Sequence, residues 1–438
     1  MTHGSNSRYG YPDWYNAGID HIWLPYTQMQ TTPAPLAVAA TDGVRLKLAD
    51  GRELIDGVSS WWTACHGYNH PHIRTAIANQ MTTMPHMMFG GLVNPPALTL
   101  ARRLSDMLPG DLNRVFFADS GSVSVEVAMK MAVQYWINQG NTTRRKFIAF
   151  QYAYHGDTIG AMSVCDPEEG MHALFKGLLA EQHIVSLPRT NAEFEVFESF
   201  LTQNAVDCAA IILEPLVQGA GGLKFHDATV LARIAECGER HGVLLILDEI
   251  MTGFGRTGSM FACEEAGVVP DIITLSKALT GGTMALSAAV AREHIFAAFQ
   301  SDKPEAALMH GPTYMANPLA CAAANASLDL FESEPRLKQV AAIETHLRNA
   351  LEPCRALLGV IDVRAKGAIG VVQVDTLTRV EWLKQRFVEE GVWIRPFGDI
   401  IYVMPPFVID LDDLTHLTNA MVKVIGEWST LQGVNVGP

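Results

Sequence analysis

Residues 243–258 read VLLILDEIMTGFGRTG. The apolar run VLLIL leads directly into two carboxylates, Asp248 and Glu249, and a glycine-rich segment follows them. A short apolar run bounded by turn residues is typical of a strand buried on both faces, as in a parallel sheet covered by helices. The stretch therefore predicts a central strand that ends in buried acidic side chains.

The chain on either side of this stretch alternates between strand-like and helix-like segments. Predicted strands are RVFFADS, KFIAFQY, CAAIILEP and DIITLSKA, and predicted helices include VSVEVAMKMAVQYW and ATVLARIAECGERH. Such alternation predicts the α/β fold class, with a mostly parallel sheet and helices on both of its faces.

The pattern changes after about residue 330. Helical segments such as VEWLKQRFVEEG and LTHLTNAMVKVIGEW then surround the strand-like IDVRAKGAIGVVQV, which predicts a smaller α+β unit. A hairpin predicted at Asp50-Gly51 could join that unit. We expect a site between the two units. The predicted organisation is an N-terminal arm and hairpin at 1–60, with 1–20 as a loose arm, a large domain at 61–330 and a small domain at 331–438.

Composition narrows the function classes. The 438 residues carry a net charge of −14, which disfavours nucleic acid as a partner. No apolar run approaches the roughly 20 residues that a membrane helix needs, and the N-terminus lacks the pattern of a signal peptide. The seven cysteines are scattered without a C-x-x-C pair, so we expect reduced thiols, a cytoplasmic protein and no metal site.

The glycine-rich segment GFGRTG matches the spacing of a dinucleotide-binding turn. Such a turn needs a helix directly after it and an acidic residue about 20 positions further on. The following GSMFACEEAGVVPD is broken by Gly267 and Pro270, and TLSKALTGG stands where the acidic residue should be. A nicotinamide oxidoreductase is therefore the weaker interpretation, and a bent loop at a strand end is the stronger one.

Asp248 and Lys277 give a better indication. Each ends an apolar strand, where a buried charge is costly unless it meets an opposite charge. The two could form a simple buried ion pair. Alternatively they could serve pyridoxal phosphate, whose chemistry needs a lysine amine and an acid facing the pyridine nitrogen. The turn at Gly121-Ser122 before a predicted helix could bind the phosphate, or could be an ordinary helix cap.

Several motifs together resemble those of a known family. DSGSVSVEVAMKMA, YHGDT, EPLVQGAGG, DEIMTGFGRTG, SKALTGG and HGPTYMANP occur in the order found in class III, fold-type I pyridoxal-phosphate aminotransferases. The resemblance spans nearly the whole chain. It implies a large domain with a mostly parallel seven-stranded sheet, a smaller α+β domain, the cofactor pyridoxal 5′-phosphate and a homodimer with active sites at the subunit interface.

The resemblance also implies roles for individual residues. Lys277 would bond covalently to the cofactor and transfer the proton, Asp248 would hold the pyridine nitrogen, and Tyr26 would complete the catalytic set. Thr313 would reach the phosphate of the neighbouring subunit, whereas His155 is interpreted as a structural histidine. The implied cofactor-binding residues are Gly121, Ser122, Tyr154, Gln218, Asp248, Ile250, Lys277, Pro312 and Thr313.

Other segments indicate the substrates. WLPYT, SSWWTACHGYNHP, MMFGGLVNPPA and GVWIRPFGDIIYVMPP resemble the branch of the family that takes an amino group from S-adenosylmethionine and gives it to 8-amino-7-oxononanoate. Aromatic walls and an arginine clamp suit a flexible chain that ends in a carboxylate. The implied substrate-binding residues are Tyr26, Trp61, Trp62, Tyr154, Asp157, Gly311, Arg395 and Tyr402.

Two positions depart from the family pattern. Leu24 stands where the family usually has histidine, and Met251 is bulkier than the alanine often found after DEI. Both bear on the choice of amino donor. A class III aminotransferase that uses an ω-amino acid or lysine therefore remains the alternative.

Overall fold

The computed structural model describes residues 11–167 and 172–432. Its largest sheet, within these residues, has seven strands in the order β4-β12-β11-β10-β7-β5-β6. Strands β10, β11, β7, β5 and β6 pair in parallel, whereas β12 is antiparallel to both of its neighbours. The bounds are β4 Leu112–Ala118, β5 Lys146–Phe150, β6 His183–Val185, β7 Cys208–Leu213, β10 Leu244–Asp248, β11 Ile272–Leu275 and β12 Ser287–Arg292.

The quoted stretch forms the middle of this sheet. Ile246 of β10 packs in one hydrophobic cluster with residues of helix α5 (Gly121–Asn138). Its neighbours Leu245 and Leu247 pack in another cluster with residues of α4 (Pro95–Met107) and α8 (Ala228–Arg240). Alternate residues of a strand face opposite sides of a sheet, so both faces are covered. The predicted α/β fold class is confirmed.

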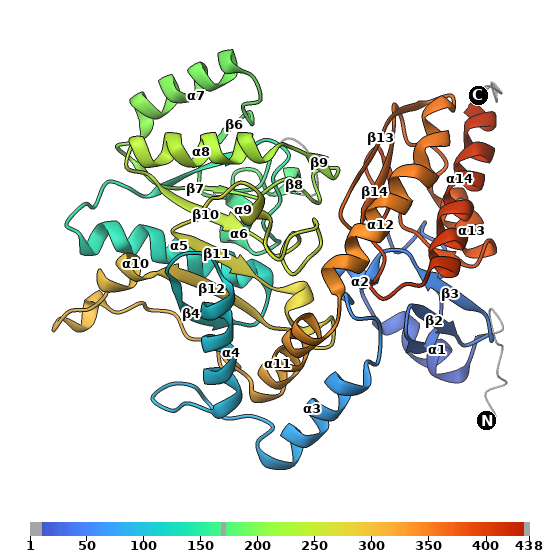
Figure 1. Ribbon diagram of the computed structural model, residues 1–438, viewed down its shortest axis with the longest axis horizontal. Helices are drawn as coiled ribbons and strands as arrows, with labels where there is room; N and C mark the ends of the chain where they lie inside the picture. Colours follow the sequence, from blue (N-terminus) through green and yellow to red (C-terminus); the bar gives the residue numbers. More distant parts are fainter. Residues whose placement is uncertain (1–10, 168–171, 433–438) are drawn as a thin grey trace.

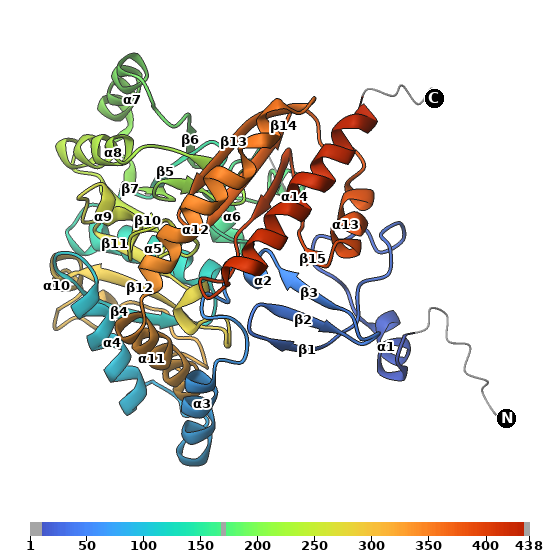
Figure 2. The same cartoon turned by 45° about the vertical axis from the view of Figure 1, so that its right-hand side comes forward.

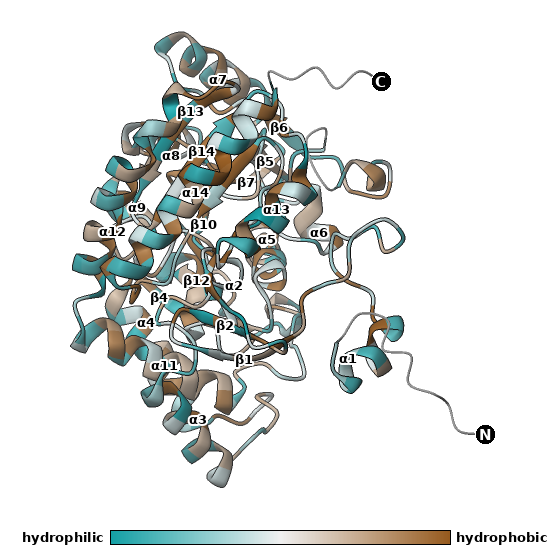
Figure 3. Ribbon diagram, turned by 90° about the vertical axis from the view of Figure 1, so that its right-hand side faces the viewer, coloured by the Kyte–Doolittle hydropathy of each residue, from teal (hydrophilic) through white to brown (hydrophobic). Residues whose placement is uncertain are grey.

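The C-terminal part forms a separate layer of helices on a small sheet. Strands β13, β14 and β16 pair in that order, and Figure 1 shows them with α12 and α14 on the opposite side of the molecule from the large sheet's outer helices. Figure 3 shows β14 largely hydrophobic and the covering helices α12 and α14 of mixed character. The bounds are α12 Arg336–Leu351, β13 Val360–Lys366, β14 Ile369–Val374, α13 Val380–Glu389, β15 Val392–Trp393, β16 Ile400–Val403 and α14 Leu411–Gln432.

The N-terminal strands lie beside this C-terminal layer. β2 (Arg45–Leu48) and β3 (Glu53–Asp56) form the predicted hairpin, and β1 (Val38–Asp42) extends it. β3 also pairs in parallel with β15, as Figure 2 shows. The expected loose arm needs a correction, because residues 13–18 form helix α1 (Asp13–Gly18) with Tyr15 buried. Residues 1–10 of that arm lie outside the described residues.

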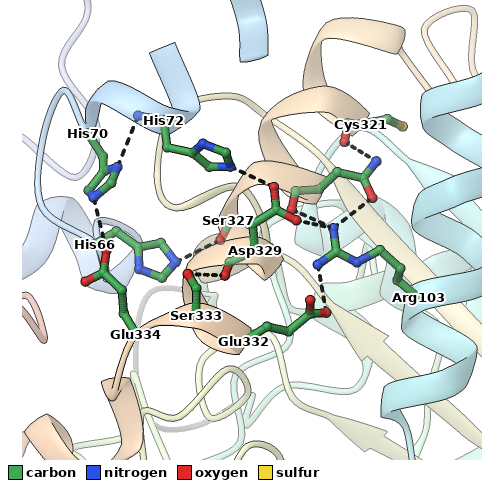
Figure 4. Close-up of polar contacts among 11 residues, drawn as sticks. His66, His70, His72, Arg103, Cys321, Ser327, Asp329, Glu332, Ser333 and Glu334 are labelled. Carbon is green, nitrogen blue, oxygen red and sulfur yellow. Dashed lines mark hydrogen bonds and ion pairs between the residues drawn. The ribbon is translucent and has the colours of Figure 1, made fainter. Parts of the chain in front are cut away.

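Short helices and polar contacts connect these parts. Helix α2 (Ser59–Trp62) lies between the two halves of the molecule in Figures 1 and 2. Figure 4 shows the polar contacts that tie α3 (Pro71–Thr83), the chain just before it and α4 to α11 (Pro318–Ser333) and to the residue that follows it. There His66 is hydrogen-bonded to Ser327 at 3.1 Å, and burial next to Arg336 lowers the pKa of His66 to about 3. His66 is thus a neutral structural residue.

Two findings bear on the composition. No helix among residues 11–167 and 172–432 is long and apolar enough to cross a membrane. All seven cysteines are free thiols and all are buried.

Candidate active site

A cavity of about 230 Å³ lies at the carboxyl ends of the central strands. Asp248 ends β10, Lys277 follows β11, and Gly121 opens the helix that follows β4. Ligands of open α/β sheets bind at this edge. The residues that line the cavity are Trp62, Ser120, Gly121, Ser122, Tyr154, His155, Gly156, Glu214, Ala220, Asp248, Ile250, Met251, Ser276 and Lys277.

Asp248 is held rigidly on the floor of this cavity. The residue is 4% exposed, and its Oδ1 accepts hydrogen bonds of 3.1 Å from the Thr274 hydroxyl and from the Ile250 backbone N–H. Its Oδ2 lies 2.7 Å from Nδ1 of His155, which is also buried. Three donors thus hold the Asp248 carboxylate in one orientation at the cavity. His155 is therefore more than a structural histidine, because it directly supports a residue that lines the cavity.

Lys277 enters the cavity from a strained backbone position. Its φ of 46° is left-handed, a conformation that costs a non-glycine residue about 1–3 kcal/mol and that clusters at functional sites. Its Nζ lies 4.6 Å from the ring centroid of Trp62. Desolvation lowers the pKa of Lys277, although Asp248, Glu214 and Asp157 act in the opposite direction. A lowered pKa favours the neutral amine that a nucleophile or general base requires.

Asp248 and Lys277 do not form the simple ion pair that the sequence left open. Asp248 is hydrogen-bonded to His155 instead, and no Lys277–carboxylate contact falls within 4.0 Å in the described part of the chain. Both side chains nevertheless line the same cavity. This arrangement leaves room for a group between the amine and the carboxylate.

The start of α5 offers an anion-binding site on the same cavity. Gly121 and Ser122 are its first two residues, where backbone N–H groups have no partner within the helix. The Ser122 hydroxyl accepts a 2.8 Å bond from the Asp157 N–H and keeps its own proton for a ligand. Gly156 packs so closely that a Cβ there would lie 1.8 Å from the Ser122 Oγ. These features fit a phosphate group.

Glu214 is a second buried carboxyl group at the cavity. It follows β7, and its side chain accepts bonds from the N–H groups of Tyr154 at 3.1 Å and Gly219 at 2.7 Å. Burial raises its pKa to about 7, with the Asp248 charge acting in the same direction and His155 opposing it. A carboxyl group poised near neutrality can donate or accept a proton at physiological pH.

Aromatic and polar side chains extend the site toward the junction of the two halves. The Tyr26 hydroxyl donates a short hydrogen bond to Asp157, and Tyr154 donates a 2.9 Å bond to the same carboxylate. Burial and Asp157 raise the pKa of Tyr26 to about 12, so this phenol stays neutral. Asp157 also pairs with His172 at 3.0 Å.

The two tryptophans link this region to the C-terminal layer. The Arg395 guanidinium lies 5.0 Å from the ring centroid of Trp61, and Trp61 packs edge-on against Tyr26. Trp62 donates a 3.3 Å hydrogen bond to Tyr402 from the floor of the cavity. The structure therefore brings the predicted aromatic residues and the arginine to one region.

Four predicted residues lie elsewhere. Gln218 is buried, but its side-chain amide donates to the Gln151 carbonyl at 2.8 Å and does not line the cavity. Gly311, Pro312 and Thr313 lie in an open loop and do not line the cavity of their own chain. The predicted roles of Gly311, Pro312 and Thr313 depend on a second subunit, and all four roles stay predictions.

Sequence reasoning missed one of the lining carboxyls and the role of His155. Glu214 follows the apolar run CAAIIL, which is the same strand-end signal that identified Asp248, so it could have been found. The contact of His155 with Asp248 joins residues 93 positions apart, and no local pattern indicates it. Met251, one of the two departures from the family pattern, lines the cavity.

Comparison with known proteins agrees with this geometry. A crystal structure of an adenosylmethionine-8-amino-7-oxononanoate aminotransferase from Methanocaldococcus jannaschii superposes with a TM-score of 0.88 at 32% identity, covering 93% of this chain and 97% of that one. An amine transaminase from an uncultivated Pseudomonas species, solved in its PLP-bound form, gives a TM-score of 0.86 at 31% identity over 93% and 99% of the two chains.

Sequence similarity extends over the same length. An adenosylmethionine-8-amino-7-oxononanoate aminotransferase of Corynebacterium glutamicum is 45% identical over 412 residues, which cover 92% of this chain and 96% of that protein. The family model for aminotransferase class-III matches residues 26–425. The motifs, the cavity and these comparisons agree, and the chain belongs to the class-III aminotransferase family.

Proposed function

We propose that this protein is a pyridoxal-phosphate-dependent transaminase that takes the amino group of S-adenosylmethionine and transfers it to 8-amino-7-oxononanoate, giving 7,8-diaminononanoate for biotin synthesis. The observation that carries the proposal is the placement of Lys277, Asp248 and the start of α5 around one cavity. The names of the similar proteins from Corynebacterium glutamicum and Methanocaldococcus jannaschii support the choice of substrates.

The cofactor of this reaction is pyridoxal 5′-phosphate, which supplies an electron sink for the bond that loses a proton. Gly121 and Ser122 would hold its phosphate, and Asp248, supported by His155, would hold its ring nitrogen. Tyr154 and Ile250, which line the cavity, would pack against the cofactor. Each of these assignments rests on the residues that surround the cavity.

Lys277 is the proposed proton carrier. Its lowered pKa makes the amine available as a base that can take the substrate's α-proton and hold it at Nζ. The buried Glu214, with its pKa of about 7, lies beside the same cavity and tunes the charge there. The acidic lining also suits a cationic sulfonium donor.

Substrate recognition is assigned to the region between the two halves of the chain. Trp61 and Trp62 form apolar walls for the carbon chain, and Arg395 binds the terminal carboxylate. Tyr26 and Asp157 meet the polar end of the amino donor. The proposed large domain, 61–330, carries the cofactor residues, while the small domain, 331–438, together with the N-terminal hairpin, carries Arg395 and Tyr402.

Two further parts of the proposal concern assembly and location. The family resemblance supports a homodimer in which Gly311, Pro312 and Thr313 contact the site of the second subunit, and we propose this assembly. Seven free, buried thiols suit a reducing compartment, and we propose the cytoplasm.

A half-reaction experiment tests the function. The purified holoenzyme is mixed with S-adenosylmethionine, and the visible absorption of the cofactor is followed; 8-amino-7-oxononanoate is then added and 7,8-diaminononanoate is measured. We expect loss of the visible band, then its return with one product formed per site. Lysine and an ω-amino acid are the comparison donors, and Lys277→Ala is the inactive control. Bleaching by these amines and not by S-adenosylmethionine would establish the alternative function instead.

The alternative rests on one observation. An amine transaminase shares this fold with a TM-score of 0.86, and this chain departs from the family pattern at Leu24 and at Met251, which lines the cavity. Leu24→His with Met251→Ala restores the family residues. An unchanged donor preference in this double variant shows that the two departures do not set donor choice.

A further inference from the structure

A cluster of potential metal ligands lies on the large sheet at the edge opposite the cavity. His183, Asp207 and Cys208 each offer one ligand atom, and these atoms all lie within 4.8 Å of one another. No other group of three such residues meets this condition in the described part of the chain. Imidazole nitrogen, carboxylate oxygen and thiolate sulfur are each ligands that zinc accepts in proteins.

The sheet places these residues together. His183 begins β6, Cys208 begins β7, and β5 lies between the two strands. Parallel strands start at the same edge of a sheet, whereas Asp248 and Lys277 lie at the other edge. A strand of five residues separates the two edges by about 17 Å. Figures 1 and 2 show β6 and β7 on the side of the sheet that carries α7 (Asn191–Asn204) and α8.

The distances fit one tetrahedral ion. Nε2 of His183 lies 3.4 Å from Oδ1 of Asp207, and Sγ of Cys208 lies 3.5 Å from the same oxygen. Ligands bound to zinc at about 2.0–2.3 Å in a tetrahedron lie roughly 3.3–3.8 Å apart. Two of the three separations therefore match ligands that share an ion, and the third, between Nε2 of His183 and Sγ of Cys208, is within the 4.8 Å limit.

The surroundings orient the ligands. Nζ of Lys146 lies 3.3 Å from Oδ2 of Asp207, which leaves Oδ1 for the ion and fixes the carboxylate. The His183 ring packs edge-on against Phe200 at 5.3 Å. Asp207 and His183 are partly exposed, at 36% and 17% of their side chains, so an ion can enter from solvent. Cys208 is buried behind them and at present donates to the Asn204 carbonyl at 3.2 Å.

We propose that His183, Asp207 and Cys208 bind a Zn²⁺ ion, with a water molecule as the fourth ligand, at the amino edge of strands β6 and β7. Binding requires the thiolate, so the Cys208 thiol releases its proton to solvent as the sulfur–metal bond forms. One ion joins β6 to β7 across β5 and stabilises the outer part of the sheet. The site is separate from the proposed transaminase chemistry.

Cobalt serves as the spectroscopic probe. The chelator-treated, dialysed holoenzyme is titrated with Co²⁺, and difference spectra are recorded at long wavelength, where tetrahedral cobalt with a thiolate ligand absorbs and the cofactor does not. We expect one equivalent per chain, displacement of the bands by Zn²⁺, and a higher unfolding temperature with Zn²⁺. Absence of stoichiometric binding by the natural protein overturns the proposal.

Variants assign the ligands. Cys208→Ser should abolish the cobalt bands, and His183→Gln should weaken binding at least tenfold. His183 is partly exposed, so its variant carries the test should Cys208→Ser fail to fold. Cys237→Ser is the matched control, since Cys237 is also a buried thiol beside a carboxylate, Glu198, at 3.4 Å. Unchanged Co²⁺ binding in both Cys208→Ser and His183→Gln overturns the assignment of the ligands. Lys277→Ala should bind cobalt normally, which separates this result from the transaminase test.

Discussion

Nδ1 of His155 lies 2.7 Å from Oδ2 of Asp248, and both side chains are almost fully buried. A buried carboxylate keeps its charge only while its partners remain, and loss of one donor leaves an uncompensated group that costs about 1–3 kcal/mol. His155 therefore acts through Asp248, as a positioning residue for the proposed site.

Replacement of His155 tests this relationship. His155→Leu should lower kcat/KM by about 10- to 100-fold, the usual effect of removing a partner that orients a functional ligand. His155→Asn keeps a donor near the position of Nδ1 and should retain most of the activity. Steady-state rates over a pH range distinguish the two, because only the leucine variant should shift the pH profile. Equal losses in both variants would contradict a hydrogen-bonding role.

Glu249 should make stability depend on pH. It is fully buried behind Asp248, and burial raises its pKa from 4.5 to about 7, although the N–H groups of Ala262 and Cys263 bond to it. Between these two pKa values the folded state binds a proton that the unfolded state does not. The contribution of Glu249 to stability is therefore greatest below pH 4.5 and falls by about 3 kcal/mol as the pH rises to about 7.

Urea unfolding across this pH range measures the effect. The stability difference between the natural protein and Glu249→Gln should fall as the pH rises from 4.5 to 7. Glu236→Gln, at an exposed position of α8, is the control and should show no such trend. A constant difference for Glu249→Gln across the range would count against the raised pKa.

Gly156 should tolerate no side chain. Its φ is 129°, and a Cβ would lie 1.8 Å from the Ser122 Oγ, at the start of α5. Gly156→Ala should therefore displace the proposed phosphate site, weaken retention of pyridoxal phosphate and destabilise the fold by at least about 3 kcal/mol.

Gly140→Ala is the matched control for Gly156. Gly140 also has a positive φ, of 83°, but nothing lies within 4 Å of its hypothetical Cβ. Gly140→Ala should lower the unfolding free energy only by the backbone strain, about 1–2 kcal/mol, and should leave cofactor retention unchanged. Fluorescence of released cofactor together with thermal unfolding reads out both effects. Full retention in Gly156→Ala would show that the close approach is not required.

Arg256 should hold the two halves of the molecule together. Its buried guanidinium donates from Nη1 to the carbonyls of Pro405 at 2.8 Å and Ala368 at 3.2 Å, and it lies 4.5 Å from the ring centroid of Phe407. Arg256→Met leaves both carbonyls without this donor and should cost about 3 kcal/mol in unfolding free energy.

Arg233→Met is the comparison for Arg256. Arg233 also lies over a ring, 3.7 Å from the centroid of Phe194, but it is partly exposed and should cost less than about 1 kcal/mol. Denaturant unfolding gives both values. Similar losses for the two arginines would mean that the carbonyl contacts contribute little.

The central strands of the large sheet that the sequence predicted are those whose residues are nearly all apolar. β7, β10 and β11 are apolar runs, and a strand buried on both faces must be apolar, so the sequence indicates them directly. β12 reads SAAVAR, whose alanines have little strand preference, and no prediction covered it. Helix α1 was missed for a similar reason, because six residues give too short a pattern.

In the site too, local sequence patterns predicted some residues and could not predict others. Strand-end charges identified Asp248 and Lys277, because a charge after an apolar run demands an explanation. The partnership of Asp248 with His155, and the distances among His183, Asp207 and Cys208, arise only when distant segments fold together. The expected absence of a metal site rested on spacing along the chain, and that spacing cannot reveal a cluster formed where two strands, β6 and β7, begin.

The position of β12 also constrains the order of folding. β12 separates β4 from the rest of the sheet, and its Ser287 donates a 2.7 Å bond to the Ser120 carbonyl at the start of α5. A chain emerging from the ribosome exposes β4 long before its only lateral neighbour has been made. Until β12 has been synthesised, β4 has an unpaired edge that can aggregate or bind chaperones.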